Sequence, residues 1–203
     1  MKIVCVGRNY AAHALELANA IPDKPLIFLK PDTAILRDNR DFEHPDFSNE
    51  IHWECEIVYR IAKQAKRVNR QEAWQYVDGI GLGIDFTARD LQDEIKKKGH
   101  PWTLAKMFDN SAPISKFLDP KEFLDHRNLH FELRVNDAVK QSGFSGNMIY
   151  PLEVLIEYIT QFITLNEGDL IFTGTPEGVG KVRVDDRLQA SLEGRSLLDF
   201  HVK

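Results

Sequence analysis

The sequence is poor in cysteine, in long apolar runs and in surplus positive charge. Only two of its 203 residues are cysteines, too few for a disulfide scaffold. Cys5 and Cys55 lie in apolar segments, where buried reduced thiols are usual. The apolar run near the N-terminus, residues 3–6, is far too short for a signal peptide or a membrane span. The net charge of −5 argues against nucleic-acid binding, which normally needs a basic surplus. We therefore expect a cytoplasmic protein with no membrane and no nucleic-acid partner.

The rest of the composition is that of a soluble globular protein. Hydrophobic residues make up 43% and charged residues 28% of the chain, which are ordinary proportions. The length suits one domain with a substantial core. No internal repeat, low-complexity tract or linker divides the sequence. We therefore predict a single domain over residues 1–203.

The segment from Ile51 to Ile61 organises the chain. Its β-branched and aromatic residues predict a strand. Because alternate side chains of a strand point to opposite faces, Glu54 and Glu56 would share one face. Two unpaired carboxylates so close in an interior strand would repel, and burial would penalise both, unless a cation lies between them. A solvent-facing edge of an amphipathic strand is the commoner explanation for such alternation.

A third carboxylate favours the cation. Asp85 lies near the end of an apolar, glycine-rich run, residues 79–86, as an acidic residue would at a strand end facing a site. Two glutamates and one aspartate are hard oxygen ligands, which suit Mg²⁺, Mn²⁺ or Ca²⁺ better than zinc. We therefore predict a metal site formed by Glu54, Glu56 and Asp85.

A histidine and a glutamate near the N-terminus are candidates for acid–base chemistry. Residues 9–20 predict a helix with Asn9 as its N-cap. His13 and Glu16 are three residues apart and so lie on one helical face. A glutamate beside an imidazole can hold its tautomer and raise its basicity, as a general base requires. A surface pair with no chemical role has the same spacing.

A second predicted helix follows Asp85, with Asp85 or Thr87 near its start and Gly99 at its end. Arg89 and Gln92 are three residues apart on it, so both could face the metal site. Pairing with acidic neighbours on the helix surface would explain the same spacing.

Two further features are candidates for binding oxyanions. Lys106 lies among apolar and aromatic residues, either as a cation directed at substrate oxyanions or as a surface lysine with a buried stem. Residues 173–180 form a loop with three glycines that could present backbone N–H groups to an anion. An ordinary strand connector is the commoner meaning of such a loop.

Periodicity and turn residues predict the remaining elements. Asn136 and Asp137 suit a hairpin turn, and residues 151–162 predict an amphipathic helix. Residues 62–76 turn basic and helical in character. Strands are expected at residues 2–6, 26–30, 33–36, 129–135, 138–141, 168–172, 187–191 and 197–202.

Taken together, these pieces resemble the fumarylacetoacetate hydrolase superfamily. The resemblance covers almost the whole chain and rests on the order and spacing of its motifs. The short chain is most similar to the compact branch that acts on acylpyruvates and oxaloacetate. The motifs are Gly7-Arg8-Asn9-Tyr10 with His13 and Glu16, Glu54-Cys55-Glu56, Asp85 with Arg89, Asp90 and Gln92, Pro101-Trp102 through Lys106 and Asp109, Asn136, Met148-Ile149, Gly168-Asp169, and Thr173 to Gly180.

The resemblance implies a fold, an assembly and a cofactor. The fold is a strand-rich α+β domain built on a mixed β-roll with a few peripheral helices, and the assembly is a homodimer. Glu54, Glu56 and Asp85 hold one Mg²⁺ or Mn²⁺, which chelates a small 2-oxo acid. Residues 8–25 form a mobile lid.

The resemblance also implies an activity. The enzyme hydrolyses a C–C bond of acylpyruvate-type 2-oxo acids through a pyruvate enolate, with oxaloacetate decarboxylation as a companion activity. The alternatives are an oxaloacetate keto–enol tautomerase, a 2-oxo-alkenoate hydratase or isomerase, and a non-enzymatic protein in which the cation only joins strands. The implied roles are water activation by His13 and Glu16, contacts to substrate oxygens by Lys106 and Gln92, a place at the substrate carboxylate for Thr175, and shaping of the site by Arg8 and Arg89.

Overall fold

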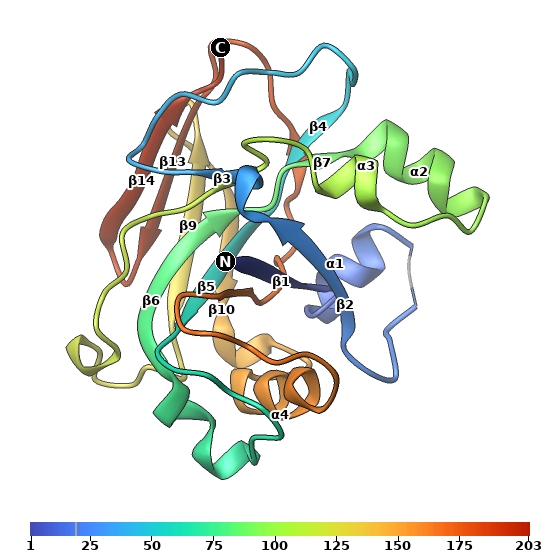
Figure 1. The fold of residues 1–203 in the computed structure, drawn as a ribbon. Helices are drawn as coiled ribbons and strands as arrows, with labels where there is room; N and C mark the ends of the chain where they lie inside the picture. Colours follow the sequence, from blue (N-terminus) through green and yellow to red (C-terminus); the bar gives the residue numbers. More distant parts are fainter. Residues whose placement is uncertain (19) are drawn as a thin grey trace.

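The computed structural model describes residues 1–18 and 20–203, and it has the strand-rich α+β architecture expected from the sequence (Figure 1). A mixed five-stranded sheet lies at its centre, in the order β2-β1-β11-β5-β6. Only the β1–β11 pair in this sheet is parallel. The strands are β1 (Lys2–Gly7), β2 (Leu26–Pro31), β5 (Cys55–Ile61), β6 (Val77–Ile84) and β11 (Leu170–Phe172).

A four-stranded antiparallel sheet, β10-β9-β13-β14, packs against the central sheet. Both of its hairpins turn through two residues with positive φ, which the right-handed twist of paired strands favours. Asn136 and Asp137 have φ of 51° and 64°, which confirms the predicted turn. The strands are β9 (His130–Val135), β10 (Ala138–Phe144), β13 (Arg187–Leu192) and β14 (Arg195–His201).

The main core lies between these two sheets. Ile57 on β5, Leu82 on β6 and Leu133 on β9 are fully buried within one apolar cluster. Helix α4 (Leu152–Phe162) adds its apolar face to the same cluster. As predicted from the 3.6-residue period, the inward residues of α4 are Leu152, Leu155, Ile156 and Ile159.

Two small sheets and three short helices surround the central sheet. The predicted continuous strand from Ile51 to Ile61 is wrong, because the chain changes sheets at Glu54. Before Glu54 the backbone pairs in the three-stranded sheet, and after it the backbone pairs with β6. The elements are β3 (Ile35–Leu36) with β8 (Ala112–Pro113), β12 (Gly180–Lys181) with β4 (Ile51–Trp53) and β7 (Thr87–Ala88), and the helices α1 (Ala11–Glu16), α2 (Arg89–Lys97) and α3 (Thr103–Lys106).

Three local predictions also need correction. Asn9 does not cap α1, because its side chain bonds to the backbone of Tyr150 and Thr173 instead. The predicted helix over residues 62–76 is reduced to a 3₁₀ helix, Arg70–Tyr76, because Ala65 forms two backbone hydrogen bonds with Leu165 and is held extended. Residues 32–34 form a 3₁₀ turn rather than the start of a strand. Among the described residues, no helix is long and apolar enough to cross a membrane.

Candidate active site

The ends of four strands bring the predicted carboxylates together. Parallel strands β1 and β11 end at the same edge of the central sheet, where antiparallel β5 begins and β6 ends. The register places Glu56 opposite Gly83, two residues before Asp85. The Asp85 N–H donates to the Glu54 carbonyl oxygen at 2.8 Å. Side chains about 30 residues apart in sequence thereby become neighbours.

The three carboxylates form a buried cluster. One oxygen each from Glu54, Glu56 and Asp85 lies within 4.8 Å of the others, and none of these residues is more than 6% exposed. The Gly174 N–H donates to Glu56 Oε2 at 2.7 Å. A Cβ at residue 174, whose φ is +94°, would lie 2.8 Å from Asn9 Cβ. Only glycine therefore lets the 173–180 loop approach closely enough to make this bond.

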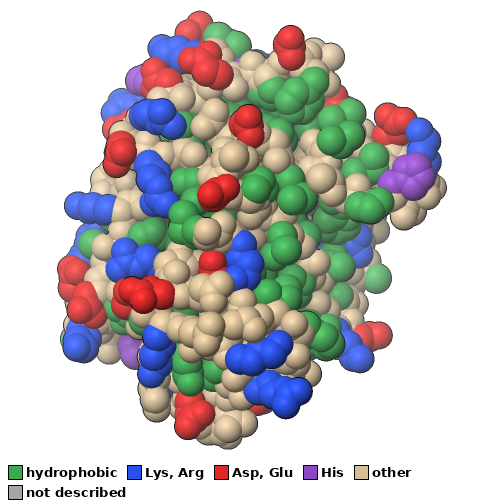
Figure 2. All heavy atoms as spheres, viewed as in Figure 1, with side chains coloured by type: hydrophobic (Ala, Val, Ile, Leu, Met, Phe, Trp, Pro, Cys, Tyr) green, Lys and Arg blue, Asp and Glu red, His purple; other side chains and the backbone are tan. Residues whose placement is uncertain are grey.

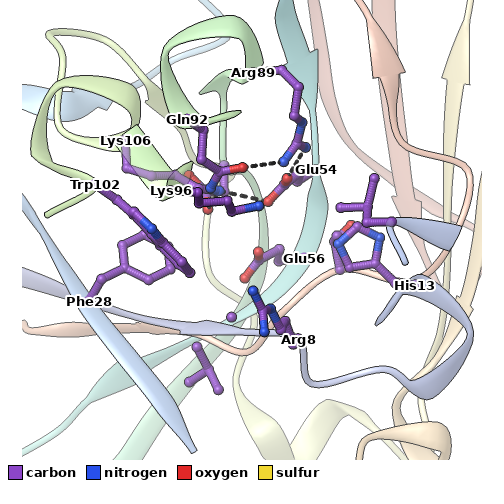
Figure 3. Close-up of a pocket in the computed structure, with 15 residues that line it drawn as sticks. Arg8, His13, Phe28, Glu54, Glu56, Arg89, Gln92, Lys96, Trp102 and Lys106 are labelled. Carbon is purple, nitrogen blue, oxygen red and sulfur yellow. Dashed lines mark hydrogen bonds and ion pairs between the residues drawn. The ribbon is translucent and has the colours of Figure 1, made fainter. Parts of the chain in front are cut away.

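Two cationic side chains neutralise part of the cluster (Figure 3). Lys106 Nζ donates to Glu54 Oε2 at 2.8 Å and to Asp85 Oδ2 at 2.6 Å. Arg89 donates to the other oxygen of Glu54. Lys106 lies on α3 and Arg89 begins α2, so both helices hold their cations against the strand ends. The predicted clustering of these residues with the carboxylates is thus present in the structure.

A third cation, Lys30 on β2, contacts Asp85 from outside the cavity lining. Lys30 is 1% exposed and donates to Phe86 O, Ser111 O and Ser111 Oγ. An ammonium group has three protons, so these bonds use all of them. Asp85 Oδ1 lies 2.8 Å from Lys30 Nζ, so the two form a buried ion pair. A carboxylate oxygen has a second lone pair, which can bind another ligand.

The environments of Glu54 and Glu56 shift their pKa values in opposite directions. Burial acts to raise the pKa of Glu54, but attraction to Lys106 and Arg89 outweighs it and holds this pKa far below its usual range. Burial, reinforced by repulsion from Asp85 and Glu54, raises the pKa of Glu56 well above its usual value. A divalent cation among the three oxygens would remove this repulsion. Its preferred ligands are such carboxylates, so the donor set fits Mg²⁺ or Mn²⁺.

His13 and Glu16 lie on α1, and His13 faces the carboxylate cluster. His13 is 5% exposed and lines the cavity that contains the carboxylates. Its Nδ1 lies 3.2 Å from Glu16 Oε2, while Glu16 Oε1 accepts a hydrogen bond from Gly178 N at 3.0 Å. Glu16 thus connects α1 to the 173–180 loop and fixes the imidazole orientation.

The remaining predicted residues line the same cavity. Gln92 accepts from Arg89 at 2.6 Å, which leaves the Gln92 amide protons for another acceptor. The Thr175 hydroxyl donates to Cys55 O at 2.8 Å and accepts from Gln141. Arg8, at the end of β1, also lines the cavity. Direct contacts of these side chains to substrate stay predictions.

Sequence reasoning missed several residues of the site. Lys30 supports Asp85, Lys96 lines the cavity, and Phe28 packs edge-on against Trp102 in the cavity wall, with ring centroids 5.8 Å apart. Lys30 could have been identified from the sequence, because a charged residue in a short apolar strand is rarely buried without a partner. Lys96 could also have been identified, because it lies four residues after Gln92 on the same helical face.

Comparison with known proteins places the chain in a family. The profile of the family described as "Fumarylacetoacetate (FAA) hydrolase C-terminal" matches residues 2–203. The chain is 43% identical over 201 residues to the bovine protein named "Oxaloacetate tautomerase FAHD1, mitochondrial" (Bos taurus), covering 99% of this chain and 91% of that protein. The protein of the same name from Arabidopsis thaliana is 43% identical over 202 residues, covering 100% of this chain and 91% of that protein.

A solved structure agrees with this assignment. The fumarylpyruvate hydrolase of Pseudomonas aeruginosa, crystallised with Mn²⁺ and pyruvate, superposes with a TM-score of 0.94 at 33% identity. The match covers 100% of this chain and 89% of that one. The strand-rich fold, the motif order and the sequence identity lead to one conclusion: this chain belongs to the fumarylacetoacetate hydrolase family.

Proposed function

We propose that this protein is a Mg²⁺- or Mn²⁺-dependent hydrolase that cleaves a C–C bond of acylpyruvate-type 2-oxo acids and also decarboxylates oxaloacetate. The observation that carries the proposal is the buried Glu54–Glu56–Asp85 cluster with His13, which contacts Glu16, in the wall of the same cavity. The relative solved with Mn²⁺ and pyruvate supports this choice of metal and substrate class. When bound, the divalent cation would supply Lewis-acid stabilisation of negative charge on the 2-oxo acid.

His13 is the proposed general base. With Nδ1 directed at Glu16, Nε2 is the nitrogen left to take a proton from water. The water oxygen adds to the distal carbonyl carbon of the acylpyruvate, and the bond from that carbon to C3 then breaks. C3 takes up a proton, so the products are a carboxylic acid and pyruvate.

Lys106 and Gln92 are the proposed ligands of substrate oxygens, and Arg89 shapes the site around them. Lys106 uses two of its protons on Glu54 and Asp85 and has a third for a substrate oxyanion. The Gln92 amide, held by Arg89, can donate to a second oxygen. These groups are buried, so water competes little for their hydrogen bonds.

The second candidate function is oxaloacetate keto–enol tautomerisation. It is supported by the names of the bovine and Arabidopsis relatives. This reaction needs a base to move a proton but no attacking water, so the same side chains could serve it. Hydration or isomerisation of 2-oxo-alkenoates is a third use of the same groups.

Turnover of acetylpyruvate and of enol-oxaloacetate, measured side by side with Mg²⁺ and with chelator, tests the proposal. We expect Mg²⁺-dependent loss of acetylpyruvate absorbance much faster than any oxaloacetate reaction. Fast enol-to-keto conversion with slow cleavage would favour the tautomerase instead. No turnover of either compound, with a metal needed only for folding, would support a purely structural cation.

We also propose that residues 8–25 open as a lid. The cavity holds about 30 Å³, which is room for only a few water molecules, so a 2-oxo acid needs a wider opening. Within this segment α1 contacts the 173–180 loop through the Glu16–Gly178 bond, which can break without disturbing the sheets. Faster amide exchange in residues 11–16 without substrate than with it would support the lid, whereas equal exchange would contradict it.

The proposed assembly is a homodimer, and the proposed location is the cytoplasm. Hydrophobic side chains gather on the face around β2 (Figure 2). Leu29 on β2 is 37% exposed, Leu104 on α3 is 72% exposed, and Phe47 is 49% exposed where it packs against Phe108. Exposed apolar surface of this kind favours association. A mass near twice 23.3 kDa by light scattering is the expected result, and a monomer would contradict the proposal.

A further inference from the structure

A second cavity lies at the N-terminal end of α4. It holds about 590 Å³, which is within the range of small-molecule sites. Among the described residues, this cavity and the one that contains the three carboxylates share no lining side chain. The 3₁₀ helix Arg70–Tyr76 packs against α4 at this end of the molecule (Figure 1). We call this space the α4 cavity, and its lining includes Tyr59, Arg70, Trp74, Arg127, Met148 and Leu152.

One part of the cavity wall is aromatic and apolar. Trp74 packs edge-on against Tyr59, with ring centroids 5.6 Å apart. Trp74 Nε1 donates to Glu153 Oε1 at 2.8 Å, which fixes the position of the indole. The side chains of Met148 and Leu152 are buried and add apolar atoms to the same wall. A preformed wall of this kind favours a flat apolar ring, because contact removes the apolar surface of both from water.

The Tyr59 hydroxyl is a polar group without a partner. Tyr59 reaches the cavity from β5 and is only 2% exposed. In the described part of the chain, its hydroxyl forms no hydrogen bond, although nearly all buried polar groups form at least one. Burial raises the pKa of Tyr59, and the charge of Glu153 raises it further, so the hydroxyl keeps its proton. It can therefore donate to an acceptor inside the α4 cavity.

Most polar groups around the cavity are hydrogen-bond donors. Arg127 donates to Glu153 through Nε alone, and Arg70 donates to Glu157 through Nε and Nη2. A guanidinium group has five N–H bonds, so both arginines keep donors for a ligand. Helix α4 begins without a side-chain cap, and the N–H groups of an uncapped helix start also favour an anion. Among the described residues, Glu153 is the one carboxylate in the lining, and it already accepts from Arg127 and Trp74.

We propose that the α4 cavity is a second ligand site, which binds a flat apolar molecule that carries one carboxylate. The ring lies against Trp74, Met148 and Leu152, and the carboxylate accepts hydrogen bonds from the Tyr59 hydroxyl and from Arg127. One negative charge suits the site, because each lining arginine is already paired with one glutamate. The site holds no residue with a role in the proposed reaction, so it does not depend on that function.

Three probes separate the two parts of such a ligand. 1-Naphthoate carries a ring and a carboxylate, 1-naphthylmethanol carries the same ring without the charge, and acetate carries the carboxylate alone. Calorimetric titration of the Mg²⁺-loaded protein measures the three dissociation constants. We expect 1-naphthoate to bind about tenfold or more tightly than 1-naphthylmethanol, because its hydrogen bonds are charge-assisted, and acetate to show no measurable binding. Saturating pyruvate should leave the affinity for 1-naphthoate unchanged, because the two cavities are separate.

Two pairs of variants assign the binding to the α4 cavity. Tyr59→Phe removes only the hydroxyl and should weaken 1-naphthoate binding by about threefold or more. Tyr158→Phe makes the same change on α4 outside the cavity and should leave the affinity unchanged. Arg127→Gln should also weaken binding, whereas Arg195→Gln, at another exposed arginine paired with one glutamate, should not. Circular dichroism spectra matching wild type verify that each variant is folded.

Several results would overturn the second site. Absence of 1-naphthoate binding to wild type, or equal affinity for 1-naphthoate and 1-naphthylmethanol, would contradict the proposed ligand class. Equal losses from Tyr59→Phe and Tyr158→Phe, or from Arg127→Gln and Arg195→Gln, would place the probe elsewhere. Displacement of 1-naphthoate by pyruvate would assign it to the cavity of the three carboxylates instead. None of these results bears on the proposed reaction, which acetylpyruvate turnover tests separately.

Discussion

The same substitution at two neighbouring glutamates should change stability in opposite directions. Glu56 is buried beside Asp85 and Glu54, and its carboxylate accepts a hydrogen bond from Gly174 N. Glu54 is equally buried but contacts Lys106 and Arg89. In the chelator-treated protein, Glu56→Gln should therefore raise the free energy of unfolding, and Glu54→Gln should lower it.

The size of the Glu56 effect follows from proton linkage. Because the folded-state pKa of Glu56 is raised above the ordinary value of 4.5, the folded protein binds more protons than the unfolded chain above that pH. Stability then falls as pH rises, by up to about 1.4 kcal/mol per pH unit. At pH 7 the accumulated cost has an upper limit of about 3.4 kcal/mol, and at pH 5 of about 0.7 kcal/mol.

Glu56→Gln removes this cost, since glutamine has the same shape, does not ionise and can still accept from Gly174. Its melting temperature at pH 7 should rise, by at most about 14 °C for a chain of this size, and the gain should shrink at pH 5. Glu54→Gln leaves buried Arg89 without its carboxylate partner and Lys106 with Asp85 alone, and should cost about 3 kcal/mol or more. Both variants should lose the rise in melting temperature that Mg²⁺ gives wild type.

Thermal unfolding followed by circular dichroism, in chelator and in Mg²⁺ at pH 7 and pH 5, measures all of these quantities. The reasoning is refuted if Glu56→Gln in chelator destabilises the protein at pH 7 as much as Glu54→Gln does. It is equally refuted if either variant keeps the full stabilisation by Mg²⁺.

Three further predictions test other parts of the account. His13→Ala should reduce acylpyruvate cleavage by about 10²-fold or more while calorimetry shows Mg²⁺ affinity unchanged; near-normal turnover would remove His13 from the mechanism. Asp169→Asn should lower the free energy of unfolding at pH 7 by about 1–3 kcal/mol, because Asp169 accepts bonds from Lys2 and from the Asn166 N–H. Although burial acts to raise the Asp169 pKa, these bonds lower it. The difference in the free energy of unfolding between variant and wild type should therefore fade as pH drops through the lowered pKa. Urea titrations at pH 7 and pH 3 measure this difference. Gly174→Ala should weaken Mg²⁺ binding and lower the melting temperature, since its Cβ would contact Asn9; unchanged Mg²⁺ affinity would show that the Gly174 bond to Glu56 is dispensable.

The metal cluster could be predicted because its residues obey simple periodicity. Alternation along a strand joins Glu54 to Glu56, and Asp85 lies one residue after β6, the strand paired with β5. The hairpin at Asn136–Asp137 and the inner face of α4 follow equally local rules. Each of these features depends on residues near one another in sequence or on adjacent strands.

The features that sequence could not predict depend on distant contacts. The break at Glu54 arises because β4 and β5 find partners in different sheets. Asn9 has the residue type of an N-cap, but Tyr150 and Thr173, over 140 residues away, take its hydrogen bonds. Lys30 becomes part of the site only because β2 pairs with β1, which brings it against Asp85. No local pattern contains these pairings.

The central claim is that Glu54, Glu56 and Asp85 together hold one catalytic divalent cation. Anomalous scattering from crystals grown with Mn²⁺ tests it most directly, because the signal locates the metal without reference to activity. The account predicts one strong peak, about 2.0–2.4 Å from an oxygen of each carboxylate, that is lost in Glu56→Gln. A peak elsewhere, or none at these carboxylates in an active Mn²⁺-loaded enzyme, would contradict it.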